Sequence, residues 1–235
     1  HAVGPYILEG SKPGAAALSC WLAHKTIPLD VRGHGQIVRT TLLSAKKLFK
    51  YLTNHRHMFE ELHAEVTGED RCSLPFTFVP LFEPDTNIVC FVARPMCWEE
   101  GKLAPNHWRL PWINLLNELI YAATSIAPLD SRRPQPAVQP YFVSRTRFEQ
   151  RQYDAASIAP VLERAGVQAD DYRRHGLFVL RSTVMNPWYG EAEQAGVNYL
   201  AGFVKHLHGA AAAAMLQVEQ ARRKMIYDKQ ETEFL

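Results

Sequence analysis

The sequence has little of several features that would define a specialised class of protein. Its 235 residues include only four cysteines, which form no CxxC pair, so a disulfide-stabilised scaffold is excluded. We interpret them as reduced thiols of a cytoplasmic protein. The formal net charge is only +2, so composition indicates neither a nucleic-acid-binding surface nor an acidic tail. No apolar run approaches the roughly 18 residues of a membrane span, and we expect no membrane association.

The sequence also lacks an initiator methionine and a recognisable signal peptide. It begins with His1, and no basic segment is followed there by an apolar stretch and a cleavage site. We therefore expect the chain to be the remainder of a longer protein. With 47% hydrophobic residues, it still has enough apolar material for a core.

Helical periodicity dominates the first quarter of the chain. An alanine-rich run predicts a helix over residues 14–24. A second helix is predicted over residues 35–53, because apolar residues recur there at intervals of three or four positions. These apolar residues are Val38, Leu42, Ala45, Phe49 and Leu52.

After residue 75 the pattern changes to strands interspersed with helices. Two β-rich runs, 76–82 and 88–94, flank a turn signature at Glu83-Pro84-Asp85-Thr86. Further strands are predicted over 138–147 and 176–185, and helices over 110–126, 157–165 and 191–224. We therefore predict an α+β fold with two parts, 1–55 and 56–235. The second part would contain an antiparallel sheet of three or four strands packed on helices.

One glycine-rich segment has the features of a phosphate site. Gly10-Ser11-Lys12-Pro13-Gly14 precedes the first predicted helix and combines free backbone N–H groups, a hydroxyl and a cation. Its spacing does not match a Walker A loop. A tight turn that leads into a helix is the alternative interpretation.

Other motifs are weaker candidates. Ser44-Ala45-Lys46-Lys47 contains the S-x-x-K pattern of serine acyl enzymes, but its K-T-G and S-D-N partners are missing. The histidines lack the spacing of a zinc site, and we expect no metal. Several arginines lie among aromatic residues, but ordinary strand alternation explains them, and we expect no nucleic-acid partner. The residues concerned are His55, His57, His63, His206 and His208, and Arg132, Arg133, Arg145, Arg147 and Arg151.

Arg181 follows the apolar run Leu177-Phe178-Val179-Leu180. A guanidinium near the end of a buried strand needs an anionic partner, and a carboxylate or phosphate fits it in a bidentate manner. That partner is either a ligand or one of the protein's own acidic residues.

Two stretches of the sequence resemble the group II pyridoxal-phosphate-dependent decarboxylases, and most closely their bacterial tyrosine decarboxylase branch. The first stretch reads Tyr6-Ile7-Leu8-Glu9-Gly10-Ser11-Lys12-Pro13-Gly14-Ala15-Ala16 and continues through Trp21-Leu22-Ala23-His24 to Ile27-Pro28-Leu29-Asp30-Val31-Arg32-Gly33-His34-Gly35. The second reads Phe178-Val179-Leu180-Arg181-Ser182-Thr183-Val184-Met185-Asn186-Pro187. The resemblance covers essentially the whole chain but only the C-terminal portion of the family.

The resemblance implies the C-terminal part of a fold-type I enzyme that converts an L-amino acid, aromatic such as tyrosine, to an amine and carbon dioxide. Residues 1–55 would then end the large cofactor-binding domain, and 56–235 would form the small domain of a cytoplasmic homodimer. Gly10 and Ser11 would contact the phosphate of pyridoxal 5'-phosphate bound in the partner subunit. Arg181 would face the substrate carboxylate, as in glutamate-type members.

Two positions depart from the family pattern. Thr183 would be a second substrate-binding residue, because it lies where tyrosine-type members carry a serine near the substrate. Threonine retains the hydroxyl and adds a methyl group. His34 replaces a more usual tyrosine. Both changes leave the substrate preference open.

The resemblance also implies that the catalytic lysine is missing from this chain. In the family, the lysine that forms a Schiff base follows a histidine in a D-x-H-K sequence upstream of these stretches. His24-Lys25 matches a different, helical part of the family, so we assign no catalytic residue and predict that the segment is inactive alone. The alternative function is a non-catalytic, partner-binding or regulatory subunit. Its helices over residues 14–53 would complement an N-terminal cofactor-binding chain.

Overall fold

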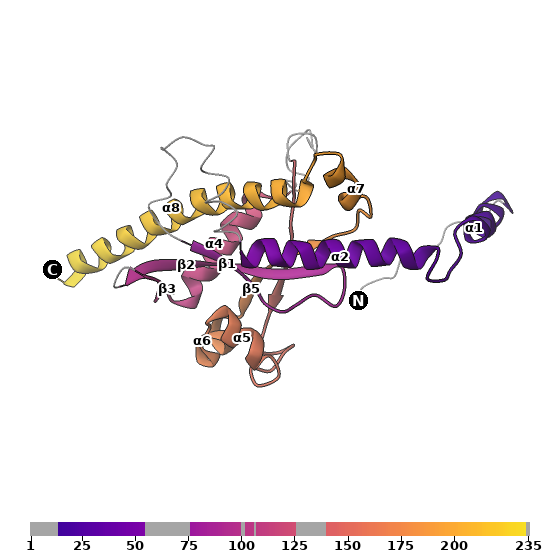
Figure 1. Ribbon diagram of the computed structural model, residues 1–235. Helices are drawn as coiled ribbons and strands as arrows, with labels where there is room; N and C mark the ends of the chain where they lie inside the picture. The colour runs from indigo at the N-terminus through magenta and orange to yellow at the C-terminus, as the bar shows by residue number, and fades with distance from the viewer. Residues whose placement is uncertain (1–13, 55–75, 100–101, 106, 126–139, 234–235) are drawn as a thin grey trace. The chain divides into compact units, whose positions relative to one another are not determined.

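The computed structural model describes residues 14–54, 76–99, 102–105, 107–125 and 140–233 (Figure 1). The chain divides into two compact units, His1–Thr40 and Thr41–Leu235. The predicted domain boundary between residues 55 and 56 lies outside the described residues and stays a prediction.

Helix α1 (Gly14–Thr26) belongs to the first unit and buries none of its residues. Its large apolar side chains are exposed, with Leu18 at 63% and Trp21 at 57% of full exposure. The alanine-rich sequence favours the helix through intrinsic propensity. Helix α2 (His34–Thr53) begins in the same unit and continues into the second.

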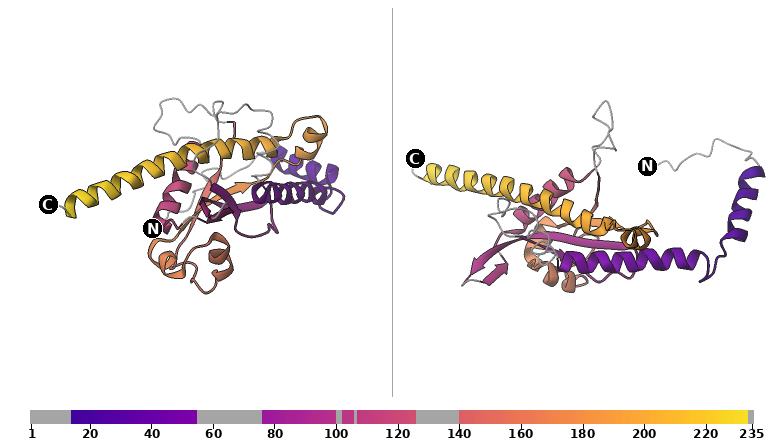
Figure 2. Two further views of the ribbon diagram at one scale, coloured as in Figure 1. Left: turned by 60° about the vertical axis from the view of Figure 1, so that its left-hand side comes forward. Right: turned by 45° about the horizontal axis from the view of Figure 1, so that its top comes forward.

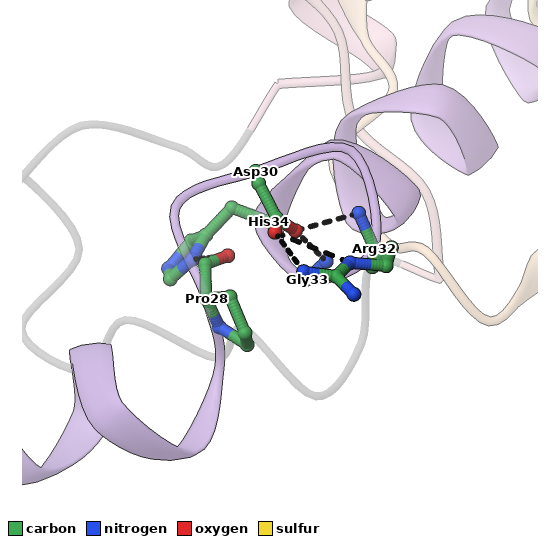
Figure 3. A network of polar contacts seen from close by, with 5 residues as sticks. All are labelled: Pro28, Asp30, Arg32, Gly33 and His34. Atoms are coloured by element: carbon green, nitrogen blue, oxygen red, sulfur yellow. Dashed lines mark hydrogen bonds and ion pairs between the residues drawn. The ribbon is translucent and has the colours of Figure 1, made fainter.

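The turn between α1 and α2 is organised around the Asp30 carboxylate (Figure 3). One of its oxygens accepts hydrogen bonds from the backbone N–H groups of Arg32 (2.8 Å) and Gly33 (3.2 Å), and the other accepts from the Arg32 guanidinium at 3.0 Å. The His34 backbone N–H donates to the Pro28 carbonyl at 2.9 Å. A Cβ on Gly33 would lie 2.1 Å from that carbonyl oxygen, so the turn requires a glycine at this position.

The second unit is built on an antiparallel sheet with the order β1-β2-β5-β4. Its strands are β1 (Phe76–Pro80), β2 (Ile88–Glu99), β4 (Ser144–Phe148) and β5 (Leu177–Thr183). The short strand β3 (Lys102–Pro105) pairs only with the end of β2. The sequence prediction of an α+β fold with an antiparallel sheet is confirmed.

Helices α4 (Leu110–Ala123) and α8 (Tyr199–Glu233) pack against each other and on one face of the sheet (Figures 1 and 2). Phe178 of β5 contacts Tyr121 of α4 with ring centroids 6.1 Å apart. The ring centroids of Phe76 in β1 and His208 in α8 lie 4.9 Å apart. Because side chains alternate along a strand, Phe91 and Phe78 point to this face as well and contact each other edge to face.

Val92 and Arg94 lie on the opposite face of β2. The Arg94 guanidinium packs on Gly166, at the end of helix α5 (Ala159–Ala165), where an added Cβ would overlap it. Arg164 of α5 stacks over the Phe49 ring of α2 at 5.4 Å. The end of α5 therefore covers part of this face.

Two buried asparagines of α4 replace hydrogen bonds of the sheet. The pairing of β2 with β5 runs from Ile88↔Thr183 to Phe91↔Leu180, and its continuation would pair Ala93 with Phe178. Instead, the Asn117 side chain accepts from the Ala93 N–H at 2.7 Å and donates to the Ala93 carbonyl at 2.9 Å. Asn114 likewise accepts from the Phe178 N–H at 2.9 Å and donates to the Gly176 carbonyl at 2.9 Å. The amides fill the opening where the two strands separate.

The single helix predicted over residues 191–224 is wrong in its first part. The structure has two helices there, α7 (Tyr189–Gln194) and α8, separated at Gly196, which has a φ of 90°. A positive φ ends a helix readily at glycine. Asn198 then begins the next helix, because its side-chain oxygen accepts a hydrogen bond from the Ala201 N–H at 2.9 Å.

Other elements differ in extent. The strand predicted over 138–147 begins only at Ser144, and the sequence did not predict helix α6 (Ala169–His175) or strand β3. The short α6 ends at Gly176, and its seven residues give too little periodicity for a sequence pattern.

We expect Asn117→Ala to lower the free energy of unfolding by about 3 kcal/mol, because it leaves a buried N–H and a buried carbonyl of Ala93 without partners. Denaturant unfolding measures this change. Gln217→Ala, on the exposed side of α8, is the control and should stay within about 0.5 kcal/mol of the wild type. An Asn117 variant as stable as the control would contradict the proposed role of the amide.

The α1–α2 turn should weaken in acid. The hydrogen bonds from Arg32 hold the pKa of the Asp30 carboxyl below its ordinary value. A lowered pKa in the folded state stabilises the turn above the ordinary aspartate value of about 3.9, and this contribution is lost as pH falls through the lowered value. The amide NMR shifts of Arg32 and Gly33 should report a midpoint below that value. Asp30→Asn should abolish the transition, and a midpoint at or above about 3.9 would contradict the prediction.

Candidate functional site

Arg181 lies in the middle of a row of three residues that crosses the sheet. On β5 it pairs with Cys90 of β2 on one side and with Ser144 of β4 on the other. Directly paired residues of an antiparallel sheet point to the same face, so the three side chains lie next to one another. This face is the one that carries Val92 and Arg94.

The Arg181 guanidinium is half-buried and is held by a neutral group. Its Nε donates a hydrogen bond to the Ser144 hydroxyl oxygen at 2.9 Å, and that hydroxyl donates to the Arg181 carbonyl at 2.9 Å. Within the described parts of the chain, no carboxylate forms an ion pair or hydrogen bond with Arg181. The alternative of an internal acidic partner is therefore not realised among these residues.

Cys90 does not supply an anion either. Burial raises the pKa of its thiol, and the nearby Arg181 charge offsets this only in part. The thiol therefore stays neutral at physiological pH. A half-buried cation flanked by a neutral thiol and a neutral hydroxyl favours an anionic ligand.

Thr183 lies two residues beyond Arg181 and ends β5. Residues two apart on a strand share a face, and they are separated by roughly 7 Å along it. Thr183 is exposed and pairs with Ile88. The structure thus brings the two predicted substrate-binding residues to one face at the end of one strand.

The predicted phosphate residues, Gly10 and Ser11, lie outside the described residues. Helix α1 follows them directly and has no acidic residue in its first turn, so its positive N-terminal end is not neutralised there. Lys25, near the other end of α1, lies over the Trp21 ring with its ammonium 5.7 Å from the ring centroid.

The weaker motifs have structural explanations where they are described. Lys47 of the S-x-x-K sequence forms an ion pair with Glu193 of α7, which occupies the ammonium that would have to activate Ser44. Among the histidines, His206 contacts the Tyr141 ring, and His208 contacts Phe76. No group of three potential metal ligands occurs among the described residues. His55, His57 and His63 lie outside them.

The described arginines that lie among aromatic residues have partners within the chain. Arg147 pairs with Glu118 at 3.4 Å, and Arg151 pairs with Glu149 at 2.6 Å. Arg145 stacks over the rings of Tyr121 and Phe178. Arg132 and Arg133 lie outside the described residues. None of the described helices is both long enough and apolar enough to cross a bilayer.

The sequence analysis did not identify Ser144 or Cys90. They lie 37 and 91 residues away from Arg181 in sequence, and only the strand register brings them together. The sequence pattern shows which residues alternate on each strand, but it does not show how the strands pair.

Comparisons with known proteins identify the family to which the chain is similar. The family described as "Tyrosine decarboxylase, C-terminal" matches residues 44–208. The chain is 29% identical to the L-tyrosine decarboxylase of Enterococcus faecium over 80% of its own length, and 32% identical to that of Levilactobacillus brevis over 81%. These alignments span only 27% and 26% of the two relatives, so the chain covers about a quarter of their length. On this evidence the chain belongs to the family of tyrosine decarboxylase C-terminal domains.

Proposed function

We propose that this chain is the C-terminal segment of a pyridoxal-phosphate-dependent amino-acid decarboxylase. The complete enzyme would convert an L-amino acid, aromatic such as tyrosine, to an amine and carbon dioxide. The family match over residues 44–208 carries this proposal, and the half-buried Arg181, which has no carboxylate partner among the described residues, supports it.

Arg181 would bind the carboxylate of the amino acid through its Nη nitrogens. The paired N–H groups of a guanidinium fit the two oxygens of a carboxylate, and such charge-assisted hydrogen bonds are strong. Thr183, on the same face of β5, would direct its hydroxyl towards the substrate, while its methyl group would narrow the space beside it. Arg181 thereby orients the group that is to leave as carbon dioxide.

Gly10 and Ser11 would bind the phosphate of the cofactor held by the partner subunit of a homodimer. The backbone N–H groups at the start of α1 suit a phosphate, and no acidic side chain opposes it in the first turn. Pyridoxal phosphate, when bound, would accept the electron pair left on the substrate as carbon dioxide departs.

The segment would be inactive alone, because the lysine that binds the cofactor would lie in the missing N-terminal portion. The stacking of Lys25 on Trp21 supports its assignment to a structural helix. We propose a cytoplasmic location for the complete enzyme. The free state of the described cysteines, Cys20, Cys90 and Cys97, is compatible with this location.

A second candidate function is a partner-binding or regulatory subunit. The exposed Leu18, Trp21 and Leu22 of α1 favour it, since apolar side chains of this size gather at protein interfaces. Such a subunit would bind an N-terminal cofactor-binding chain through residues 14–53.

The isolated chain should form no covalent bond with the cofactor. After incubation with pyridoxal phosphate and reduction with borohydride, peptide mass spectrometry should find no lysine modified at stoichiometric yield. The intact Levilactobacillus brevis L-tyrosine decarboxylase is the positive control. Stoichiometric modification of Lys25 or Lys12 alone would contradict the assignment of the catalytic lysine to a missing segment.

A chimera tests the proposed activity. This chain would replace the matching segment of the Levilactobacillus brevis enzyme, and tyramine formation from L-tyrosine would be measured. We expect activity in the chimera, and Arg181→Ala should lower kcat/KM about 10- to 100-fold, as expected for the loss of a charge-assisted hydrogen bond.

Arg173→Ala is the matched control for the chimera, because this arginine is exposed on α6 and pairs with Asp170. It should leave kcat/KM unchanged. A dimeric, cofactor-containing chimera that forms no tyramine, or an Arg181 variant as active as the control, would contradict the proposal.

A further inference from the structure

Ser144 makes two hydrogen bonds to the same residue. Its hydroxyl oxygen accepts from the Arg181 Nε, and its hydroxyl hydrogen goes to the Arg181 carbonyl, both at 2.9 Å. The side chain and the backbone of Arg181 are therefore tied to one point on the neighbouring strand. An arginine side chain has several rotatable bonds, and these contacts select one arrangement among its rotamers.

The contact with Ser144 determines which edge of the guanidinium remains available. A guanidinium offers a side edge that includes Nε and an end edge formed by the two Nη nitrogens. Ser144 occupies the Nε position, and no described residue forms a hydrogen bond with either Nη nitrogen. The end edge is the one that can bind both oxygens of a carboxylate.

Arg181 differs in its contacts from several other described arginines of the second unit. Arg147, Arg151, Arg173 and Arg222 pair with acidic residues. Arg145 and Arg164 stack over aromatic rings. Arg94 is also half-buried without an anion, but its guanidinium packs against Gly166. Arg181 is held by its Nε and keeps its Nη nitrogens free of partners among the described residues.

We infer that Ser144 is a positioning residue, which fixes Arg181 so that its two Nη nitrogens receive the carboxylate of the substrate. This inference rests on the proposed role of Arg181 in binding that carboxylate. Ser144 itself would not touch the substrate. It would lower the cost of ordering Arg181 when the ligand binds, because the side chain is ordered beforehand.

The experiment measures carboxylate binding by the intact chain rather than activity. The probe is 3-(4-hydroxyphenyl)propionate, and tyramine, which lacks the carboxylate, is the matched control ligand. NMR of the arginine Nε–H groups follows both the binding and the hydrogen bond to Ser144. In the wild type we expect a slowly exchanging Arg181 Nε–H that shifts with the propionate and not with tyramine.

Ser144→Thr and Ser144→Val form a matched pair, because the two side chains have nearly the same shape and only threonine keeps a hydroxyl. We expect the threonine variant to bind the propionate like the wild type. The valine variant should bind about fivefold more weakly, because Arg181 is no longer ordered before the carboxylate binds, and its Nε–H should exchange faster. Thr146→Ala, two residues along the same face of β4, is the control and should change neither property.

The outcomes separate this inference from the function on which it rests. If Arg181→Ala binds the propionate as well as the wild type, the proposed role of Arg181 fails and the inference fails with it. If binding depends on Arg181 but the valine variant binds like the threonine variant, only the role of Ser144 is overturned.

Discussion

The placement of β5 in the sheet depends on two amide side chains of α4. Asn117 and Asn114 take over the hydrogen bonds that Ala93 and Phe178 would otherwise exchange across the separating strands. A buried backbone group without a partner costs enough free energy to disfavour the fold, so strand separation at this point is tolerated only because the amides are present. The same contacts hold α4 on the sheet and fix the register that leads to Arg181.

Around Arg181 the sheet provides neutral neighbours instead of counter-charges. Cys90 and Ser144 flank the guanidinium on the two adjacent strands, and burial keeps the thiol protonated. An internal carboxylate would have compensated the charge and closed the site to anions. A cation that is ordered but not neutralised is suited to recognise the carboxylate of a ligand, and the family to which the chain belongs includes enzymes named for an amino-acid substrate.

The sequence predicted the elements with strong local signals. The helix expected over residues 35–53 is α2, and the hairpin expected at 76–94 is formed by β1 and β2. The prediction of one helix over 191–224 was wrong at Gly196. There a positive φ ends α7, and the Asn198 side chain caps the start of α8. Glycine is a weak helix breaker in sequence, and its effect here depends on backbone contacts that form only in the fold.

The sequence by itself determined the α+β class, the resemblance to the decarboxylases and the choice of Arg181 as a candidate anion-binding residue. Each of these depends on residues that lie close together along the chain. Only the tertiary structure decided that Ser144 and Cys90 flank this arginine and that no described carboxylate neutralises it. The physical reason is the strand register. Ser144 is 37 positions and Cys90 is 91 positions away from Arg181 in the sequence. They become its neighbours only because β5 pairs with β4 and with β2.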